Sequence, residues 1–142
     1  REEAVRDRAA SAGTDRGCVM FTKHFSKAEF CCNHCGKSGP LFGLEILRTA
    51  LFMEQIRAFL GNRAIKVNSG YRCPYWNEKN GGEPNSYHLR GMACDFTVVG
   101  MSPAEVQARL EEPGSPVAKG GLGSYQSFTH ADRRGYRARW AK

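Results

Sequence analysis

The stretch 86–95 constrains this chain most, because it places an imidazole and a carboxylate seven residues apart with a glycine between them. His88 offers a neutral nitrogen and Asp95 an anionic oxygen. A catalytic zinc ion commonly takes three such protein ligands and keeps a fourth position open. The apolar run 92–99 predicts a strand that carries Asp95, while His88 arrives from the preceding loop and Gly91 lets the backbone turn. A third ligand is therefore expected elsewhere in the chain.

The third ligand is predicted in the short segment 128–132, which we expect to be a strand. Side chains alternate along a strand, so Phe128, His130 and Asp132 share one face. His130 can then meet a metal while Asp132 stands beside it. Each of these side chains taken alone is more often packed or solvated than a ligand, and only their joint arrangement with 86–95 favours a metal site.

The residues around both segments resemble the zinc D-Ala-D-Ala carboxypeptidase family, in the superfamily that also holds lysostaphin and the Hedgehog signalling domain. The pattern Ser86-x-His88-x-x-Gly91-x-Ala93-x-Asp95, followed 35 residues later by a histidine, carries this resemblance. The resemblance extends over 21–140 and points to the phage and bacterial cell-wall branch. The other matching motifs are Phe25-Ser26-x-x-Glu29-Phe30-x-Cys32 with Cys35-Gly36, Ser69-Gly70-Tyr71-Arg72, Asn77, Gly81-Gly82, Gly121-x-Gly123-x-Tyr125 and Arg137-x-Arg139-Trp140.

The resemblance implies a zinc-dependent peptidase that acts on the stem peptides of bacterial peptidoglycan. It would hydrolyse peptide bonds that contain a D-amino acid, either as a D,D-carboxypeptidase or as a cross-link endopeptidase or endolysin. One catalytic Zn²⁺ would be held by His88, Asp95 and His130. Arg72 corresponds to the arginine that faces the substrate's carboxylate in the resembling enzymes, which suits a guanidinium because it binds carboxylates in a bidentate manner. The further substrate-binding candidates are Ser86 and Tyr125.

The identity of the general base stays open at this point. Relatives with other motif variants carry a Glu or Asp three residues before the last histidine ligand, where this chain has Ser127. Asp132 is the nearest acid. We predict it either as the catalytic base that takes a proton from water, or as an acceptor that fixes the tautomer of His130. The cell-wall branch shares this His-x-Asp ending, so the missing upstream acid is compatible with an active enzyme.

The length of 142 residues predicts one domain, with 1–20 as a flexible lead-in and 21–142 as the peptidase domain. No run of 18 apolar residues occurs, so we expect no transmembrane segment, and the charged beginning shows no signal peptide. We expect a monomer. A phage lysin, a virion component or an exported bacterial enzyme would each act on the cell wall, and the sequence leaves the localisation unknown.

Local patterns predict an α+β fold in which a small antiparallel sheet carries the zinc site and helices pack on one side of it. Apolar residues at helical spacing predict a helix over 44–60, which Gly61 ends. The polar, glycine-rich stretch 73–85 predicts a long surface loop. The remaining predicted elements are a short helix opened by the capping box Ser26–Glu29, a strand at 65–67, a helix over 103–110 opened by the capping box Ser102–Glu105, and a hairpin of 121–125 with 128–132.

Six cysteines allow either disulfides or metal binding. Cys32 and Cys35 form half of a zinc knuckle, which predicts a second, structural zinc site. Free thiols or one local disulfide are an equally weighted alternative. The residues that could complete a site of four ligands are Cys31, His24, His34, Cys18 and Cys73. Cys94 precedes Asp95 on the predicted strand, so we expect it to point to the opposite face and pack in the core.

Two rival functions follow from the same residues. A metal-bearing module of this fold could bind the cell wall or a protein without turnover. A basic zinc-knuckle protein could instead bind nucleic acid, since the net charge is +7 and the last ten residues are rich in arginine. The chain has no ladder of aromatic and basic residues for base stacking, so we expect no nucleic-acid partner.

Overall fold

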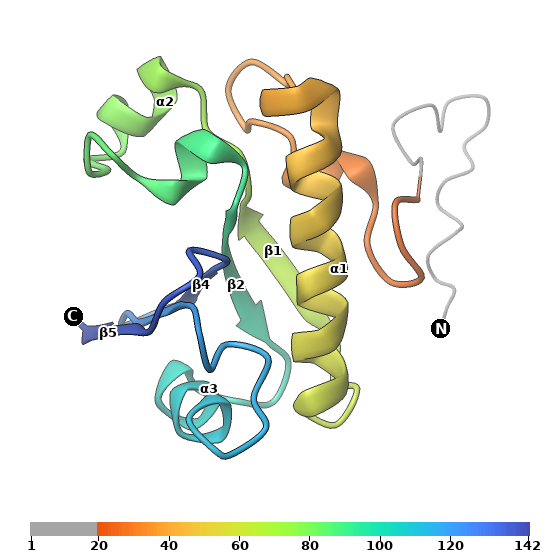
Figure 1. The fold of residues 1–142 in the computed structure, drawn as a ribbon, viewed down its shortest axis with the longest axis vertical. Helices are drawn as coiled ribbons and strands as arrows, with labels where there is room; N and C mark the ends of the chain where they lie inside the picture. The colour runs from red at the N-terminus through yellow and green to blue at the C-terminus, as the bar shows by residue number, and fades with distance from the viewer. Residues whose placement is uncertain (1–19) are drawn as a thin grey trace.

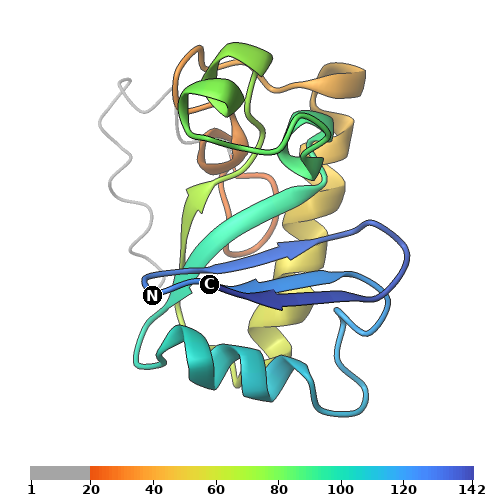
Figure 2. The same ribbon diagram turned by 90° about the vertical axis from the view of Figure 1, so that its left-hand side faces the viewer.

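The computed structural model describes residues 20–142, and a sheet of five strands occupies its centre (Figures 1 and 2). In space the order of the strands is β1-β2-β4-β3-β5. Neighbouring strands are antiparallel except for β3 and β5, which run parallel. The strands are β1 (Ile65–Ser69), β2 (Ala93–Val98), β3 (Gly121–Ser124), β4 (Thr129–Asp132) and β5 (Ala138–Ala141). The predicted hairpin is therefore present as β3 and β4, and β5 is an addition at the sheet edge that the sequence patterns did not indicate.

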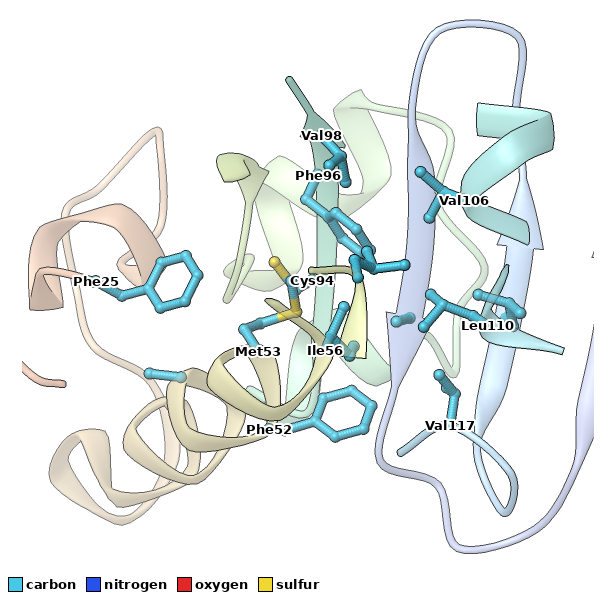
Figure 3. Close-up of a cluster of buried hydrophobic side chains, with 14 of the residues drawn as sticks. Phe25, Phe52, Met53, Ile56, Cys94, Phe96, Val98, Val106, Leu110 and Val117 are labelled. Atoms are coloured by element: carbon cyan, nitrogen blue, oxygen red, sulfur yellow. The ribbon is translucent and has the colours of Figure 1, made fainter. Parts of the chain in front are cut away.

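Helix α1 (Leu44–Phe59) runs along one face of the sheet and supplies most of the core (Figure 1). Its buried side centres on Ile46 and Met53, which belong to one cluster with Cys94 and Phe96 of β2 (Figure 3). The predicted helix is confirmed, although not all of its apolar residues are buried, since Leu51 is 51% exposed.

Capping boxes open two of the shorter helices, as the sequence predicts. Ser26 caps the 3₁₀ helix η2 (Lys27–Phe30), and Ser102 caps α3 (Pro103–Leu110). In each case a serine hydroxyl and a glutamate carboxylate satisfy backbone groups that the first turn leaves unpaired. Helix α3 lies at one end of the sheet (Figure 2), where Val106 and Leu110 are fully buried.

The stretch 73–85 is not a loop throughout, and that prediction is wrong for its first half. Helix α2 (Pro74–Lys79) occupies it, with Pro74 in the first turn and the Cys73 thiol accepting a hydrogen bond from the backbone N–H of Trp76. Two further 3₁₀ helices, η3 (Pro40–Gly43) and η4 (Tyr87–Arg90), precede α1 and β2 respectively. Helix α2 and η4 lie together at the end of the sheet opposite α3 (Figure 1).

The fold is α+β and forms a single domain, as predicted. No helix in residues 20–142 combines the length and the apolar character needed to cross a membrane. The predicted flexible lead-in falls almost entirely on 1–19, which lie outside the described residues. The division into a lead-in and a peptidase domain therefore stays a prediction.

Candidate metal centre

Strand pairing brings the predicted metal ligands together. Asp95 on β2 and His130 on β4 are direct cross-strand partners, so their side chains emerge side by side on the same face of the sheet. His88 reaches the same point from η4, whose end is marked by Gly91 in the left-handed conformation with a φ of 71°. Cys94 points to the opposite face and is fully buried in the core, as expected from alternation.

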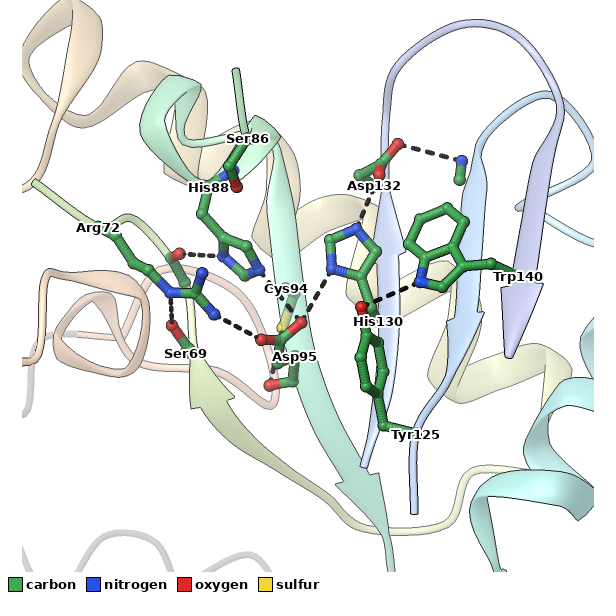
Figure 4. Close-up of polar contacts among 12 residues, drawn as sticks. Ser69, Arg72, Ser86, His88, Cys94, Asp95, Tyr125, His130, Asp132 and Trp140 are labelled. Atoms are coloured by element: carbon green, nitrogen blue, oxygen red, sulfur yellow. Dashed lines mark hydrogen bonds and ion pairs between the residues drawn. The ribbon is translucent and has the colours of Figure 1, made fainter. Parts of the chain in front are cut away.

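Three electron-rich atoms face one another at this point (Figure 4). His88 Nδ1 lies 2.7 Å from the carbonyl oxygen of Gly70, which can only accept, so Nδ1 carries the proton and Nε2 keeps its lone pair. His130 Nε2 lies 2.8 Å from the Asp132 carboxylate, which leaves the lone pair on Nδ1 of the neutral ring. Both lone pairs are directed at Asp95 Oδ1, at distances of 3.1 and 2.9 Å. A cation placed between the three atoms would satisfy all of them.

The donor set fits a zinc ion. The three ligand atoms lie within 4.8 Å of one another, and all three side chains are buried. Two imidazole nitrogens and one carboxylate oxygen are a typical set for a zinc that retains an open position. The carbonyl of Gly70 and the carboxylate of Asp132 hold the outer nitrogen of each ring, which is how metal-binding histidines are usually oriented.

Electrostatics at the site favour the ligand forms of His88 and Asp95 and a positive charge beside or on His130. Burial lowers the pKa of His88, so its ring is neutral at pH 7. Burial raises the pKa of Asp95, but the adjacent His130 and His88 rings outweigh burial and hold this pKa well below its usual range. Burial lowers the pKa of His130, but the carboxylates of Asp132 and Asp95 on its two sides raise it more. The centre is therefore a buried position where positive charge is stabilised.

Asp132 lies on the far side of the His130 ring from the donor cluster (Figure 4). The carboxylate is fully buried and forms a short ion pair with Arg134, at 2.7 and 2.8 Å. It also accepts hydrogen bonds from the backbone N–H groups of Gly121 and Arg134. Both oxygens are thus engaged within the protein. Of the two roles left open by the sequence, this geometry favours the acceptor that orients His130.

Arg72 lies beside the donor cluster and contacts it directly. Its guanidinium donates to Asp95 Oδ2 at 2.8 Å, to Ser69 Oγ at 3.1 Å and to Asn77 Oδ1 at 3.3 Å. Asp95 therefore presents one oxygen to the two imidazoles and the other to the guanidinium. Arg72 also lines the cavity described next, where its guanidinium holds the Asp95 carboxylate in place. The substrate-binding role of Arg72 stays a prediction.

A cavity of about 410 Å³ opens over the cluster and exposes it to a ligand. Ser86 lines the cavity, and its hydroxyl accepts a hydrogen bond from the His88 backbone N–H, which fixes the turn that carries the His88 side chain. Tyr125 lines it from the β3–β4 connection, and its hydroxyl oxygen accepts a hydrogen bond from Trp140 Nε1 at 3.0 Å. The phenolic O–H of Tyr125 is left as a donor towards the cavity. Glycine at position 123 is required here, because any side chain would overlap the Trp140 ring.

Comparison with known proteins agrees with the geometry of the site. The family model described as Peptidase M15 matches residues 23–132, which is more than half of the chain. This chain belongs to the peptidase M15 family. A relative from Haemophilus influenzae, described as the probable peptidoglycan L,D-endopeptidase MepK, is 34% identical over 80 residues. The match covers 51% of this M15 chain and 41% of that relative, so the chain spans less than half of the relative's length.

Sequence reasoning gave no site role to several residues that line the cavity of this M15 domain, among them the charged Glu83 and Arg134. Glu83 lies in the polar connection between α2 and η4, and nothing in the sequence distinguishes it there from an ordinary solvated glutamate. Arg134 belongs to the basic C-terminal run, which charge alone assigns to the surface. Only the fold shows that Arg134 pairs with Asp132.

The basic run at the C-terminus is largely engaged in ion pairs. Arg133 contacts Glu45 at 2.6 Å, and Arg137 and Arg139 both contact Glu111. These pairs attach the chain after β4 to α1 and to the end of α3. The positive charges of these arginines are therefore partly balanced by acidic side chains of the same chain.

Proposed function

We propose that this chain is a zinc metallopeptidase that hydrolyses peptide bonds containing a D-amino acid in bacterial peptidoglycan. The observation that carries the proposal is the convergence of two imidazole lone pairs and one carboxylate oxygen at the base of an open cavity, where His88, Asp95 and His130 would hold the ion. Membership of the peptidase M15 family and the peptidoglycan endopeptidase name of the H. influenzae relative support the same reaction class.

Zinc bound at this centre supplies a Lewis acid and lowers the pKa of a water molecule towards neutrality. The residues of the chain contribute orientation and charge. Asp132 holds the His130 ring through Nε2, and the Gly70 carbonyl holds the His88 ring through Nδ1. Tyr125 donates from its phenol to the oxygen of the scissile carbonyl. Glu83 is an acid that lines the cavity outside the ligand set, so it is our candidate for the group that accepts a proton from water or returns one to the leaving amine.

We further propose that the preferred substrate is a cross-link and not a free D-Ala terminus. A carboxypeptidase needs a cation reserved for the terminal carboxylate of its substrate. The guanidinium of Arg72, the residue that the family resemblance assigns to this task, already contacts the Asp95 carboxylate at 2.8 Å. The relative's description as an endopeptidase points in the same direction.

Digestion of purified peptidoglycan tests this function directly. The protein would be incubated with cross-linked muropeptide dimers and with monomers that end in D-Ala-D-Ala, and the products separated by chromatography. We expect conversion of dimers to monomers, loss of this activity on treatment with a chelator, and its return when Zn²⁺ is added. His88→Ala and His130→Ala should abolish it, while His24→Ala, an exposed histidine outside the cluster, should not.

The possible results separate the alternatives. Release of free D-Ala from monomers without dimer cleavage would establish the carboxypeptidase instead of the endopeptidase. Stoichiometric zinc with retention on cell-wall sacculi but no product from either substrate would establish a binding module. Full activity in the His88→Ala variant would refute the metal centre itself.

A further inference from the structure

Three cysteine sulfurs lie together at a second position, outside the catalytic cavity. Cys32 and Cys35 flank a turn after η2, and Cys73 immediately precedes α2. Their Sγ atoms all lie within 4.8 Å of one another, although Cys73 is 41 residues from Cys32 in sequence. Tetrahedral zinc with Zn–S bonds of about 2.3 Å places its sulfur ligands about 3.8 Å apart, so the cluster needs only small side-chain movements to bind one.

The backbone around Cys32 has the hydrogen bonds that stabilise a thiolate. The backbone N–H of Cys73 donates to Cys32 Sγ at 3.4 Å, and Trp76 N–H donates to Cys73 Sγ at the same distance. The turn is closed by Gly36, with a φ of 74°, whose N–H donates to the Cys32 carbonyl at 2.8 Å. A Cys-x-x-Cys-Gly turn with N–H groups directed at sulfur prearranges two ligands for a metal.

We propose that Cys32, Cys35 and Cys73 bind a second, structural zinc ion. A disulfide would join two of these sulfurs and leave the third unpaired, whereas a metal uses all three. The adjacent Cys31 has no place in the cluster. The imidazole of His34 lies in the same turn and stacks on Trp76 with ring centroids 5.2 Å apart, so His34 or a water molecule is a candidate for the fourth position.

Such an ion would fix the wall of the catalytic cavity. In the sequence, only two residues separate Cys73 from Gly70, whose carbonyl holds the His88 ring. They are Tyr71, whose N–H donates to the Phe30 carbonyl, and Arg72, whose N–H donates to the His88 carbonyl. Arg72 in turn holds the ligand Asp95. Zinc would therefore join the turn after η2 to the start of α2. This link would limit the movement of Arg72, which contacts the His88 carbonyl and the Asp95 carboxylate.

Metal analysis of the full chain and three variants tests the second site. The wild-type protein should bind two zinc ions, Cys73→Ser should bind one, and the matched control Cys31→Ser should bind two. His88→Ala should retain one. With cobalt in place of zinc, the wild-type and His88→Ala proteins should show thiolate-to-cobalt charge-transfer absorption, which histidine and carboxylate ligands cannot produce.

These measurements do not depend on peptidase activity, so they separate the two proposals. One zinc that is lost in Cys73→Ser but kept in His88→Ala would support the cysteine site and refute the catalytic centre. One zinc with the opposite behaviour would overturn the cysteine site. Absence of the charge-transfer band in the wild type would overturn it too, even if Cys73→Ser fails to fold. Fewer than six free thiols in the denatured, unreduced protein, with Cys32, Cys35 or Cys73 among the missing ones, would show a disulfide in place of the metal.

Discussion

Replacing Asp132 by asparagine separates the two roles that this residue can have. The amide is isosteric with the carboxylate but carries hydrogens on one side. Arg134 donates to both carboxylate oxygens, so the amide oxygen will turn to Arg134 and its NH₂ group will face His130 Nε2. The ring then exchanges its tautomer and carries its proton on Nδ1, the nitrogen directed at Asp95. Zinc binding must reverse this exchange.

The size of the effect follows from the contacts that are lost. Removing an outer partner of a metal-binding histidine typically weakens metal affinity 10- to 100-fold, which is about 1.4 to 2.7 kcal/mol. The substitution also breaks the ion pair between the buried Asp132 carboxylate and the partly buried Arg134, which costs roughly 3 kcal/mol of folding stability. The Asp132→Asn variant should therefore be measured at a low temperature, after circular dichroism has shown that it is folded.

A zinc titration of peptidase activity is the decisive assay for Asp132→Asn. An orienting role predicts that the activation curve shifts to 10- to 100-fold higher free zinc, while the turnover at saturation stays within a few-fold of the wild type. A general base predicts the reverse, with an unchanged curve midpoint and a turnover that falls by two to four orders of magnitude. The second pattern would refute the geometric reasoning.

Three further predictions concern the support of the site. Glu83→Gln should leave zinc affinity within about two-fold of the wild type, because Glu83 touches no ligand, and a fall in turnover in the same titration would identify it as the proton carrier. Thr49→Val should lower the free energy of unfolding by about 1–3 kcal/mol in urea denaturation. The buried Thr49 hydroxyl donates to the Gly91 carbonyl and accepts from Arg133, and both partners would lose it. The hydrogen bond from Arg133 lowers the pKa of Glu45 in the folded state, so this contact stabilises the protein above the unfolded pKa of about 4.3 and is lost as pH falls through the folded pKa. The difference in urea midpoint between wild type and Glu45→Gln should accordingly shrink from pH 7 to pH 3.

The parts of the site that follow from local chemistry could be predicted from the sequence. Alternation along a strand placed His130 and Asp132 on one face and sent Cys94 to the core, and the structure has both features. The turn at Gly91 followed from the glycine itself. These inferences hold because each depends on a few consecutive residues and a fixed geometric period.

The parts that depend on distant contacts could not be predicted in this way. Strand β5 is a short segment whose pairing with β3 is parallel, and its own residues give little sign of a strand. Helix α2 begins at a proline capped by a cysteine thiol, and composition alone made the same residues look like a loop. The pairing of Arg72 with Asp95 joins residues 23 positions apart, so charge patterns in the sequence could not assign it.

The charge arrangement around the centre explains why a divalent ion suits it. Arg72 and Arg134 each neutralise one carboxylate, that of Asp95 and that of Asp132, and the His130 ring lies between these two pairs. Without a metal, the charges of these two arginines and two aspartates therefore cancel, and the arginines form the outer ends of the arrangement. A bound zinc ion would add two positive charges in a buried position at the base of the cavity, and no carboxylate of the ligand set is left to cancel them. An electron-rich substrate oxygen is then the group that best completes the site, so the arrangement favours a polarised peptide carbonyl over a neutral surface contact.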